Sequence, residues 1–202
     1  MSSDTDIRIL EAALAIVGTK GAAALTMEDV ATAAGVSRQA VYLHFKTRAR
    51  LLTALAAHVD ATRGLHRLRR KVMTAKTPLE ALRAVVELQA TYFPRIREIA
   101  LALEAARYTD EAAGAAWNER MAERRAQLTK LIARLARERL LDAAWTEGEA
   151  IDFLVALSSI KVWESLVVER GWSKKRYVEH IERVLVSALT PAAAAKGRRG
   201  SR

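Results

Sequence analysis

Apolar residues recur along this chain at the three- and four-residue spacing of helices that bury one face. No run alternates between apolar and polar positions, so no strand is predicted. Pro94 is expected to break one run, because proline lacks the amide donor of a helix interior. The pattern predicts an all-α fold of about nine helices. The expected helices are a first one from Ile7 to near Gly21, two short ones within 26–46, a fourth from Thr47, then 78–93, 94–107, 110–141, 146–167 and 173–189.

The most distinctive local pattern lies at residues 26–46, TMEDVATAAGVSRQAVYLHFK. Thr26 followed three residues later by Asp29 is typical of a capping box at the start of a helix. Gly35 suits a left-handed turn after that helix, and Ser37 can cap a second one. The segment therefore predicts a helix-turn-helix.

The second of these helices has Ala40, Val41 and Phe45 for its inward face. Arginine and glutamine on the outward face can bond bidentately to guanine and adenine, while tyrosine, histidine and lysine suit phosphate oxygens. An ordinary solvated helix face is the alternative, since these residue types are common on surfaces. The outward residues are Arg38, Gln39, Tyr42 and His44, with Lys46 just beyond them.

With its neighbours, this segment resembles the DNA-binding domain of the TetR family of bacterial transcriptional regulators. The resemblance covers residues 6–55, where DIRILEAALAIVGTKG, LTMEDVATAAGVS, RQAVYLHFK and TRARLLTAL occur in this order. Gln39 and Ala40 stand where the family often has a Gly-Thr or similar small pair, which leaves the base preference open. Thr47 begins the fourth helix and could offer unpaired N–H groups to a phosphate. The resemblance implies that Thr26, Ser37, Tyr42, His44 and Lys46 hold the DNA backbone and that Arg38, Gln39 and Ala40 face bases.

The formal net charge of +10 is unevenly distributed. Residues 77–190 are neutral, and the excess lies mainly in 51–76 and 191–202. A basic balance favours polyanions such as nucleic acid. Both clusters lie outside the recognition segment, so a solvated end and a solvated linker face are the alternatives. The linker cluster is Arg67, Arg69, Arg70 and Lys71.

Charge and aromatic content together suggest four parts of the chain. Nine of the eleven aromatic residues lie between Tyr92 and Tyr177, which places the larger core in the second half. The expected parts are a DNA-binding domain at 1–50, a connecting fourth helix at 51–76, a helical ligand-binding and dimerisation domain at 77–190 and a disordered basic tail at 191–202.

The last two predicted helices carry more apolar residues than one packing face needs. Two copies related by a twofold axis would bury the excess in a four-helix bundle, as the resemblance also implies. A monomer that buries the same surface internally is the alternative. The residues expected at the dimer interface are Ile151, Leu154, Val155, Val162, Leu166, Tyr177, Ile181, Val184 and Leu185.

A small hydrophobic or aromatic effector could lodge among the aromatic residues of the second region and change the fit to DNA. Plain core packing is the alternative for these residues. Arg95, Arg97 and Arg107 could meet an acidic ligand group, although pairing with Glu98 and Glu104 is the other interpretation. The candidate ligand residues are Tyr92, Phe93, Leu101, Trp117, Met121, Phe153, Leu157 and Trp163.

These patterns predict a homodimeric regulator that binds double-stranded DNA. Twofold symmetry would place two recognition helices ~34 to 36 Å apart, so the operator should be a near-palindrome. The expected action is repression that a small-molecule effector relieves. A nonspecific nucleic-acid-binding or architectural protein, which the net charge favours, is the alternative.

Other protein classes find little support in the sequence. The chain has no cysteine, its four histidines show no metal-ligand spacing, and no GxSxG, P-loop or GxGxxG motif occurs. We therefore expect no catalysis, no metal and no cofactor. No apolar stretch approaches the length of a membrane span, and the N-terminus lacks the pattern of an export signal. A soluble cytoplasmic protein without a membrane partner is expected.

Overall fold

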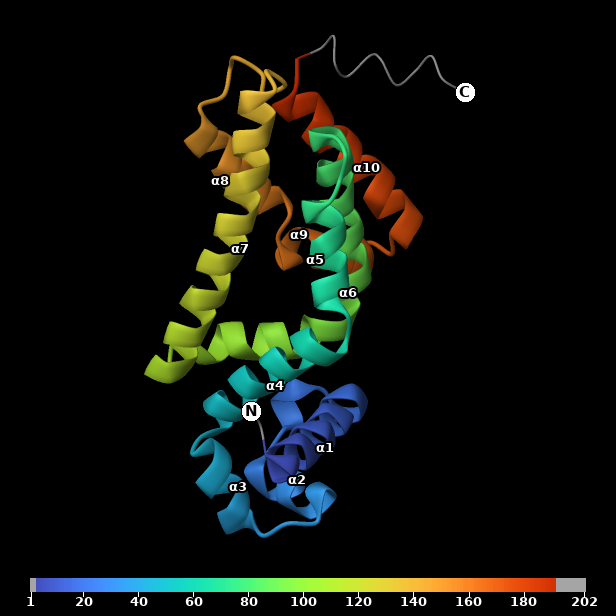
Figure 1. Cartoon of the computed structure of the whole chain (residues 1–202). Helices are drawn as coiled ribbons and strands as arrows, with labels where there is room; N and C mark the ends of the chain where they lie inside the picture. Colours follow the sequence, from blue (N-terminus) through green and yellow to red (C-terminus); the bar gives the residue numbers. More distant parts are fainter. Residues whose placement is uncertain (1–2, 192–202) are drawn as a thin grey trace. The chain divides into compact units, whose positions relative to one another are not determined.

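Figure 1 shows the computed structural model of the chain, which describes residues 3–191. Within these residues there are ten α-helices and no strand, which confirms the predicted all-α fold. Contacts divide them into two compact units. The first runs up to Gly64 and includes Arg95–Met121, and the second comprises Leu65–Pro94 and the residues from Ala122 on. The long helices α6 (Pro78–Ala106) and α7 (Glu111–Arg137) contribute to both units.

The first unit is built around α1, whose start carries a reciprocal capping box. Asp6 N donates to Ser3 Oγ at 3.1 Å, and Ser3 N donates to Asp6 Oδ2 at 2.7 Å. Helix α1 contacts α2 and α4, and α3 contacts the same two helices. The helical elements completed within this unit are α1 (Asp4–Lys20), the 3-10 turn η1 (Ala22–Ala24), α2 (Met27–Ala34), α3 (Arg38–Phe45) and α4 (Arg48–Thr62). Its buried core includes Ile9, Leu10, Leu25, Val30, Val41, Leu51, Leu52 and Leu55.

The second unit has a core of its own. Two side-chain bonds join α10 to α6: the Tyr177 hydroxyl donates to Gln89 Oε1 at 3.0 Å, and Lys174 Nζ donates to Thr91 Oγ1 at 2.9 Å. Besides parts of α6 and α7, the unit contains α5 (Leu65–Met73), α8 (Glu147–Leu157), α9 (Ile160–Trp163), the π-helical turn η2 (Glu164–Glu169) and α10 (Lys174–Leu189). Its fully buried residues include Leu82, Val86, Ile132, Leu135, Leu154, Tyr177, Leu185 and Leu189.

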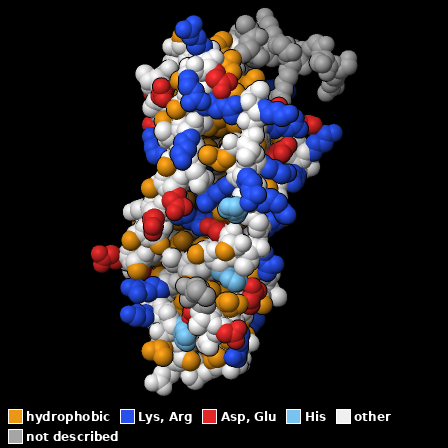
Figure 2. All heavy atoms as spheres, in the orientation of Figure 1, with side chains coloured by type: hydrophobic (Ala, Val, Ile, Leu, Met, Phe, Trp, Pro, Cys, Tyr) orange, Lys and Arg blue, Asp and Glu red, His pale blue; other side chains and the backbone are white. Residues whose placement is uncertain are grey.

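The predicted connecting helix at 51–76 is two helices. Helix α4 ends at Thr62, and Gly64 adopts a φ of 83°, which an L side chain rarely takes. The basic segment after it forms the separate helix α5, which lies in the second unit. Its basic residues are exposed or half-buried, and Figure 2 shows Lys and Arg side chains gathered over α5. The contact-based division also differs from the boundaries expected at residues 50 and 76.

The predicted break at Pro94 is wrong, because α6 continues through it to Ala106. Proline removes one backbone donor and disturbs the preceding turn, but it does not have to end a helix. Tyr92 and Ile96 on either side are buried, and their burial offsets the missing bond. Pro94 is instead the residue at which α6 passes from one unit to the other.

Helix α7 ends at Arg137, four residues before the predicted end at 141. Leu140 N donates to Leu135 O at 2.8 Å, and Arg139 N donates to Ala136 O at 3.0 Å. This is the Schellman pattern of a helix terminus, and Arg139 fills its left-handed position with a φ of 56°. The end was missed because glycine usually occupies that position.

The predicted helix at 146–167 is also interrupted. Its start is confirmed, since Thr146 and Glu149 form the expected capping box. Helix α8 then ends at Leu157, Ser158 is fully buried, and Ser159 caps the short helix α9. The apolar run alone gave no sign of this break, because two serines in a row do not exclude a helix.

The predicted basic tail lies almost wholly outside the described residues, which end at Pro191. Of the helices within 3–191, none combines the length and the apolar character needed to cross a membrane.

Candidate nucleic-acid interface

Helices α2 and α3 form the predicted helix-turn-helix. Asp29 N donates to Thr26 Oγ1 at 3.0 Å at the start of α2, while the Thr26 hydroxyl donates to the Asp29 carboxylate. Gly35 closes α2 in the left-handed conformation, with φ 63° and ψ 38°. Val36 N donates to Ala31 O, and Ala40 N donates to the Ser37 hydroxyl at the start of α3. The turn is therefore fixed by bonds within residues 26–40.

The C-terminal end of α2 has one further support, from α1. Arg8 Nη2 donates to Ala34 O at 2.8 Å and reaches Gly35 O at 3.5 Å. A cation at this position stabilises the carbonyls at the end of a helix. Arg8 thus links the turn between α2 and α3 to α1.

Helix α3 buries one narrow face and exposes the other. Val41 is fully buried and Phe45 is nearly so, whereas Arg38 and Gln39 are exposed. Tyr42 is 39% exposed, and the Arg38 guanidinium carbon lies 5.5 Å from the centroid of its ring. Arg38, Gln39 and Tyr42 thus form one exposed polar surface, arranged as predicted, with no intramolecular cover.

Leu43 on α3 was not among the predicted site residues. It is 77% exposed, more than any other large apolar residue within 3–191. Its position, two residues after the buried Val41 and two before the buried Phe45, puts it on the opposite side of the helix. The same spacing in the sequence implies an outward Leu43, although Ala40 is the only apolar residue in the predicted base-facing set. A leucine there could contact a thymine methyl group.

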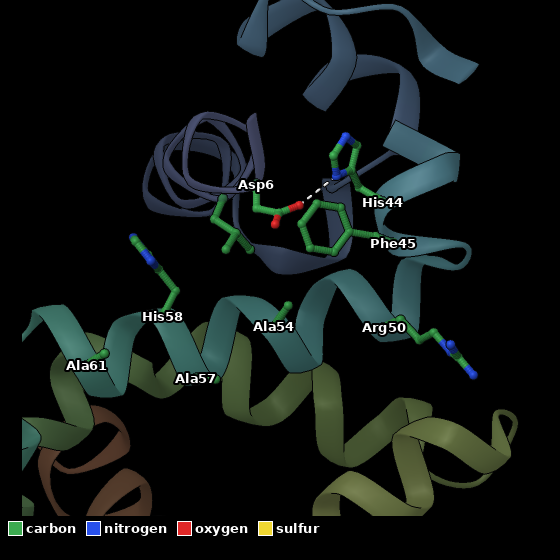
Figure 3. Close-up of a pocket in the computed structure, with 9 residues that line it drawn as sticks. Asp6, His44, Phe45, Arg50, Ala54, Ala57, His58 and Ala61 are labelled. Carbon is green, nitrogen blue, oxygen red and sulfur yellow. Dashed lines mark hydrogen bonds and ion pairs between the residues drawn. The ribbon is translucent and has the colours of Figure 1, made fainter. Parts of the chain in front are cut away.

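His44 turns toward the protein. Its Nδ1 lies 2.7 Å from Asp6 Oδ1, and Figure 3 shows the two side chains pointing toward each other beside Phe45. Asp6 is held as a carboxylate, since its bond from the Ser3 backbone lowers its pKa, aided by the Ser3 hydroxyl and by His44. The pair joins α3 to the start of α1, so one ring nitrogen of His44 already has a partner.

An open groove of about 470 Å³ surrounds this pair in the first unit (Figure 3). On the α4 side, His58 Nε2 meets Glu11 Oε1 of α1 at 2.6 Å. Both histidines thus link α1 to a neighbouring helix. The groove is lined by Asp6, Leu10, His44, Phe45, Arg50, Ala54, Ala57, His58 and Ala61.

Lys46 occupies an unusual backbone conformation between α3 and α4. Its φ is 57° and its ψ is −49°, and Thr47 N donates to Phe45 O across it at 2.6 Å. This is a γ-turn, which is rare and strained for a residue with a side chain. Thr47 then caps α4 by accepting from Arg50 N at 3.1 Å. Lys46 is exposed, as are Thr26, Ser37 and Thr47, and Ala40 is half-buried.

The eight candidate ligand residues are divided between the units. In the second unit, Phe93 and Trp163 make an edge-to-face contact with centroids 6.0 Å apart, and Phe153 lies 5.0 Å from Trp145. Tyr92 is buried, and Leu157 packs against the core of that unit. These residues therefore pack within the core of the second unit, and their role in ligand binding stays a prediction.

The other three candidates lie in the first unit. Leu101 lines an open groove of about 570 Å³ together with Arg48 and Glu98. Trp117 is buried, and Met121 is half-buried.

The three arginines considered for an acidic ligand have contacts within the first unit. Arg97 pairs with Glu98, and Arg95 donates to the carbonyl of Arg63. Arg107 stacks on Tyr108 and lies 5.5 Å from the ring centroid of Trp117.

The candidate dimer residues differ sharply in accessibility. Leu154, Tyr177 and Leu185 are fully buried in the core of the second unit, and Ile151 and Ile181 nearly so. The apolar pattern could not separate these core residues from surface ones, and they leave no side-chain surface for a partner. Those that keep accessible surface are Val155, Val162, Leu166 and Val184, the last of them 44% exposed.

This geometry is that of a helix-turn-helix protein whose second helix presents polar side chains outward, with a larger helical unit in the same chain. Residues 9–55 match the family model described as bacterial regulatory proteins, tetR family. The resemblance predicted from the sequence is confirmed for this segment, which is a TetR-type DNA-binding domain.

Solved structures extend the likeness to the fold of nearly the whole chain. A proposed TetR-family transcriptional regulator from Rhodococcus sp. is 20% identical, with a TM-score of 0.70 over 94% of this chain and 100% of that one. A proposed transcriptional regulator from Saccharomonospora viridis in complex with choline is 18% identical, with a TM-score of 0.78 over 94% and 100%. NalD, the secondary repressor of the MexAB-OprM multidrug efflux pump in Pseudomonas aeruginosa, is 24% identical, with a TM-score of 0.68 over 93% and 96%.

The comparison with curated proteins found no match. The structures above show that the chain has the TetR-family fold. The family model and these structures are those of transcriptional regulators.

Proposed function

We propose that this protein is a transcriptional repressor that binds a near-palindromic operator as a homodimer and is released by a small-molecule effector. The observation that carries the proposal is the outer face of α3, where Arg38, Gln39 and Tyr42 are exposed. Arg38 and Gln39 can bond to base edges in the major groove and the Tyr42 hydroxyl to a phosphate, and two copies would read two half-sites.

The remaining roles follow from position around α3. Lys46, Thr47, Thr26 and Ser37 are exposed at helix termini, where side chains and N–H groups suit phosphate oxygens. Ala40 and Leu43 would contribute apolar contacts to bases. His44 would reach the DNA backbone through Nε2, since Asp6 already binds Nδ1.

The homodimer would use apolar surface that remains accessible in the second unit, at Val155, Val162, Leu166 and Val184. An effector in that unit would act by favouring a conformation whose recognition helices no longer fit the half-site spacing, with a coupling of typically ~1 to 3 kcal/mol. Complexes of similar folds with a small molecule, such as choline, support this part of the proposal.

Selection of bound genomic fragments by the purified protein tests the function. We expect an inverted repeat to emerge, with Arg38→Ala altering the preferred bases and Lys46→Ala weakening all sites about equally. Recovery of fragments without a shared sequence would instead favour the architectural alternative. A preference altered by Lys46→Ala but not by Arg38→Ala would contradict the roles assigned to these residues.

A further inference from the structure

Asp6 and His44 form a pair in which the direction of the hydrogen bond can be assigned. His44 Nδ1 lies 2.7 Å from Asp6 Oδ1, and the two side chains are 27% and 25% exposed. Asp6 is ionised, because its bond from the Ser3 backbone N–H, aided by the Ser3 hydroxyl, lowers the pKa of its carboxyl. An ionised carboxylate has only acceptors, so the proton between these atoms belongs to the imidazole. His44 therefore carries a proton on Nδ1.

This assignment determines what the other ring nitrogen of His44 can do. A neutral imidazole carries a single N–H, so with that proton on Nδ1 the Nε2 atom has a lone pair and accepts hydrogen bonds. The oxygens of a DNA phosphate are acceptors as well. Neutral His44 in this orientation therefore has no donor for the DNA backbone. Only the imidazolium, which carries a proton on both nitrogens, can donate to Asp6 and to a phosphate together.

The opposite tautomer of neutral His44 is excluded by the position of Asp6. With its proton on Nε2, the ring would place a lone pair against a carboxylate oxygen only 2.7 Å away. Asp6 is also held from its other side, because its Oδ2 accepts from Ser3 N at 2.7 Å in the capping box of α1. The carboxylate thus cannot turn away from the ring without breaking the cap of α1.

The other charged groups near the pair come from α4 and α2. On α4, Arg50 and His58 line the same groove, and Figure 3 shows Arg50 pointing away from the pair. His58 Nε2 lies 2.6 Å from Glu11 Oε1 of α1. On α2 the carboxylates are those of Glu28 and Asp29, and neither pairs with the histidine of α3 within residues 3–191. Asp6 is therefore the carboxylate that acts directly on this ring.

We propose that Asp6 is a positioning residue for DNA binding, which holds His44 so that only its imidazolium binds an operator phosphate, and that binding therefore takes up a proton at His44. This inference rests on the proposed function, in which His44 contacts the DNA backbone. Asp6 favours the imidazolium with and without DNA, whereas the exposed cations Arg38 and Lys46 of the same segment oppose it. The phosphate adds its negative charge only in the complex, so the proton occupancy of His44 rises on binding.

The sign of the resulting pH dependence follows from linkage. A complex that binds more protons than its free components is favoured at low pH, so operator affinity falls as the pH rises. The decline reaches up to about tenfold per pH unit for each protomer where His44 is neutral in the free protein.

Calorimetric titration of the full-length protein with the selected inverted repeat counts the protons. The binding enthalpy is measured between pH 7 and 9 in pairs of buffers that differ in ionisation enthalpy, and the difference gives the number of protons taken up. His44→Gln keeps an amide donor for the phosphate but cannot be protonated. We expect the wild type to take up more protons than this variant, by up to about one per protomer. Equal uptake by the two proteins throughout this range would overturn the proposal.

Asp6→Asn separates positioning from a purely structural role. The asparagine oxygen can accept from Ser3 N as Asp6 does, while its amide donates to His44 Nδ1. Neutral His44 then carries its proton on Nε2 and can donate to a phosphate without taking one up. Anisotropy titrations from pH 6 to 9 should show an operator affinity that changes little with pH, below that of the wild type at pH 6 and equal to it or higher at pH 9. A parallel loss of affinity at every pH would contradict the positioning role.

His58→Gln is the matched control. His58 is also bound to a carboxylate of α1 in the same groove, but it belongs to α4 and its side chain is only 11% exposed. This variant should keep the proton uptake and the pH dependence of the wild type, and circular dichroism checks that all three variants are folded. A loss of uptake as large as that of His44→Gln would show that the proton does not belong to His44.

Selection of an inverted repeat by the wild type distinguishes this inference from the function on which it rests. If the repeat is selected but its binding takes up as many protons in His44→Gln as in the wild type, the inference fails and the regulator survives. If no duplex is preferred, the proposed function fails, and this inference fails with it.

Discussion

The helix-turn-helix and the α8–α9 segment both join two short helices across a tight break, but different parts of the chain hold the two breaks. Gly35 and Ser37 close the first within the segment itself, with Arg8 as a single outside support. The second depends on Arg124, which reaches the acceptors of Val155 and Ser158 from α7. The first break is thus held mainly by bonds within its own segment, whereas the second relies on a contact from another helix.

Removal of Arg124 should have the largest effect on stability. Arg124→Met leaves the buried acceptors at Val155 and Ser158 without a donor, and we expect a loss of about 2 kcal/mol in the free energy of unfolding, measured by urea denaturation. Arg125→Met breaks only an exposed pair and should cost less than about 1 kcal/mol. Equal losses in the two variants would contradict the tertiary dependence of the second break.

Two alanine substitutions at glycine test the local nature of the first break. Gly35→Ala forces a side chain into the left-handed conformation and should cost about 1 kcal/mol, although its Cβ would meet nothing closer than Arg8 Nη2 at 3.7 Å. Gly18 lies within α1, and a Cβ there would meet nothing within 4 Å, so Gly18→Ala should stabilise by about 0.5 to 1 kcal/mol. The unfolding temperatures of the two variants should shift in opposite directions. Shifts in the same direction would contradict the explanation from backbone conformation.

Two substitutions of Lys46 separate the effect of backbone strain on stability from the effect of charge on DNA binding. Lys46→Gly and Lys46→Ala both remove the ammonium group, so both should weaken operator binding to a similar extent. Only glycine relieves the γ-turn, and Lys46→Gly should therefore be the more stable of the two by about 1 kcal/mol. Denaturation and fluorescence anisotropy measure the two quantities separately. Equal stability would mean that the turn is not strained.

The smallest effect is expected from pH, at the start of α8. The Thr146 side chain and then its backbone hydrogen-bond to Glu149 and lower the pKa of that carboxyl. A group with a lowered folded pKa stabilises above its unfolded pKa of about 4.3, and this stabilisation is lost as the pH falls through the folded value. Glu149→Gln should show a slightly flatter decline in unfolding temperature between pH 5 and 3. A steeper decline than that of the wild type would contradict the assignment.

The helices that could be predicted are those whose ends are determined locally. Four helix ends were predicted from a capping residue or a glycine, and the structure confirms each of them: Thr26, Gly35, Ser37 and Thr146. The end of α7 and the break at Ser158 could not be predicted in this way. They depend on a non-glycine residue in a left-handed conformation and on a buried contact from another helix.

The same distinction applies to the candidate site. The spacing of inward residues on α3 predicted that Arg38, Gln39 and Tyr42 face outward, and the same spacing implies an outward Leu43. The pairing of His44 with Asp6 joins residues 38 positions apart, so no local sequence pattern indicates it. Buried and accessible residues of the last helices share one apolar pattern, so burial in the folded chain was needed to separate Leu154 from Val184.

The central claim is that α3 reads sequence, and its most direct measurement is a pair of anisotropy titrations at one salt concentration. The wild-type protein is titrated with the selected inverted repeat and with a scrambled duplex of the same composition. We predict an affinity ratio of about 10³ or more, which Arg38→Ala reduces. Equal affinity for both duplexes would contradict the claim and would identify a nonspecific nucleic-acid-binding protein.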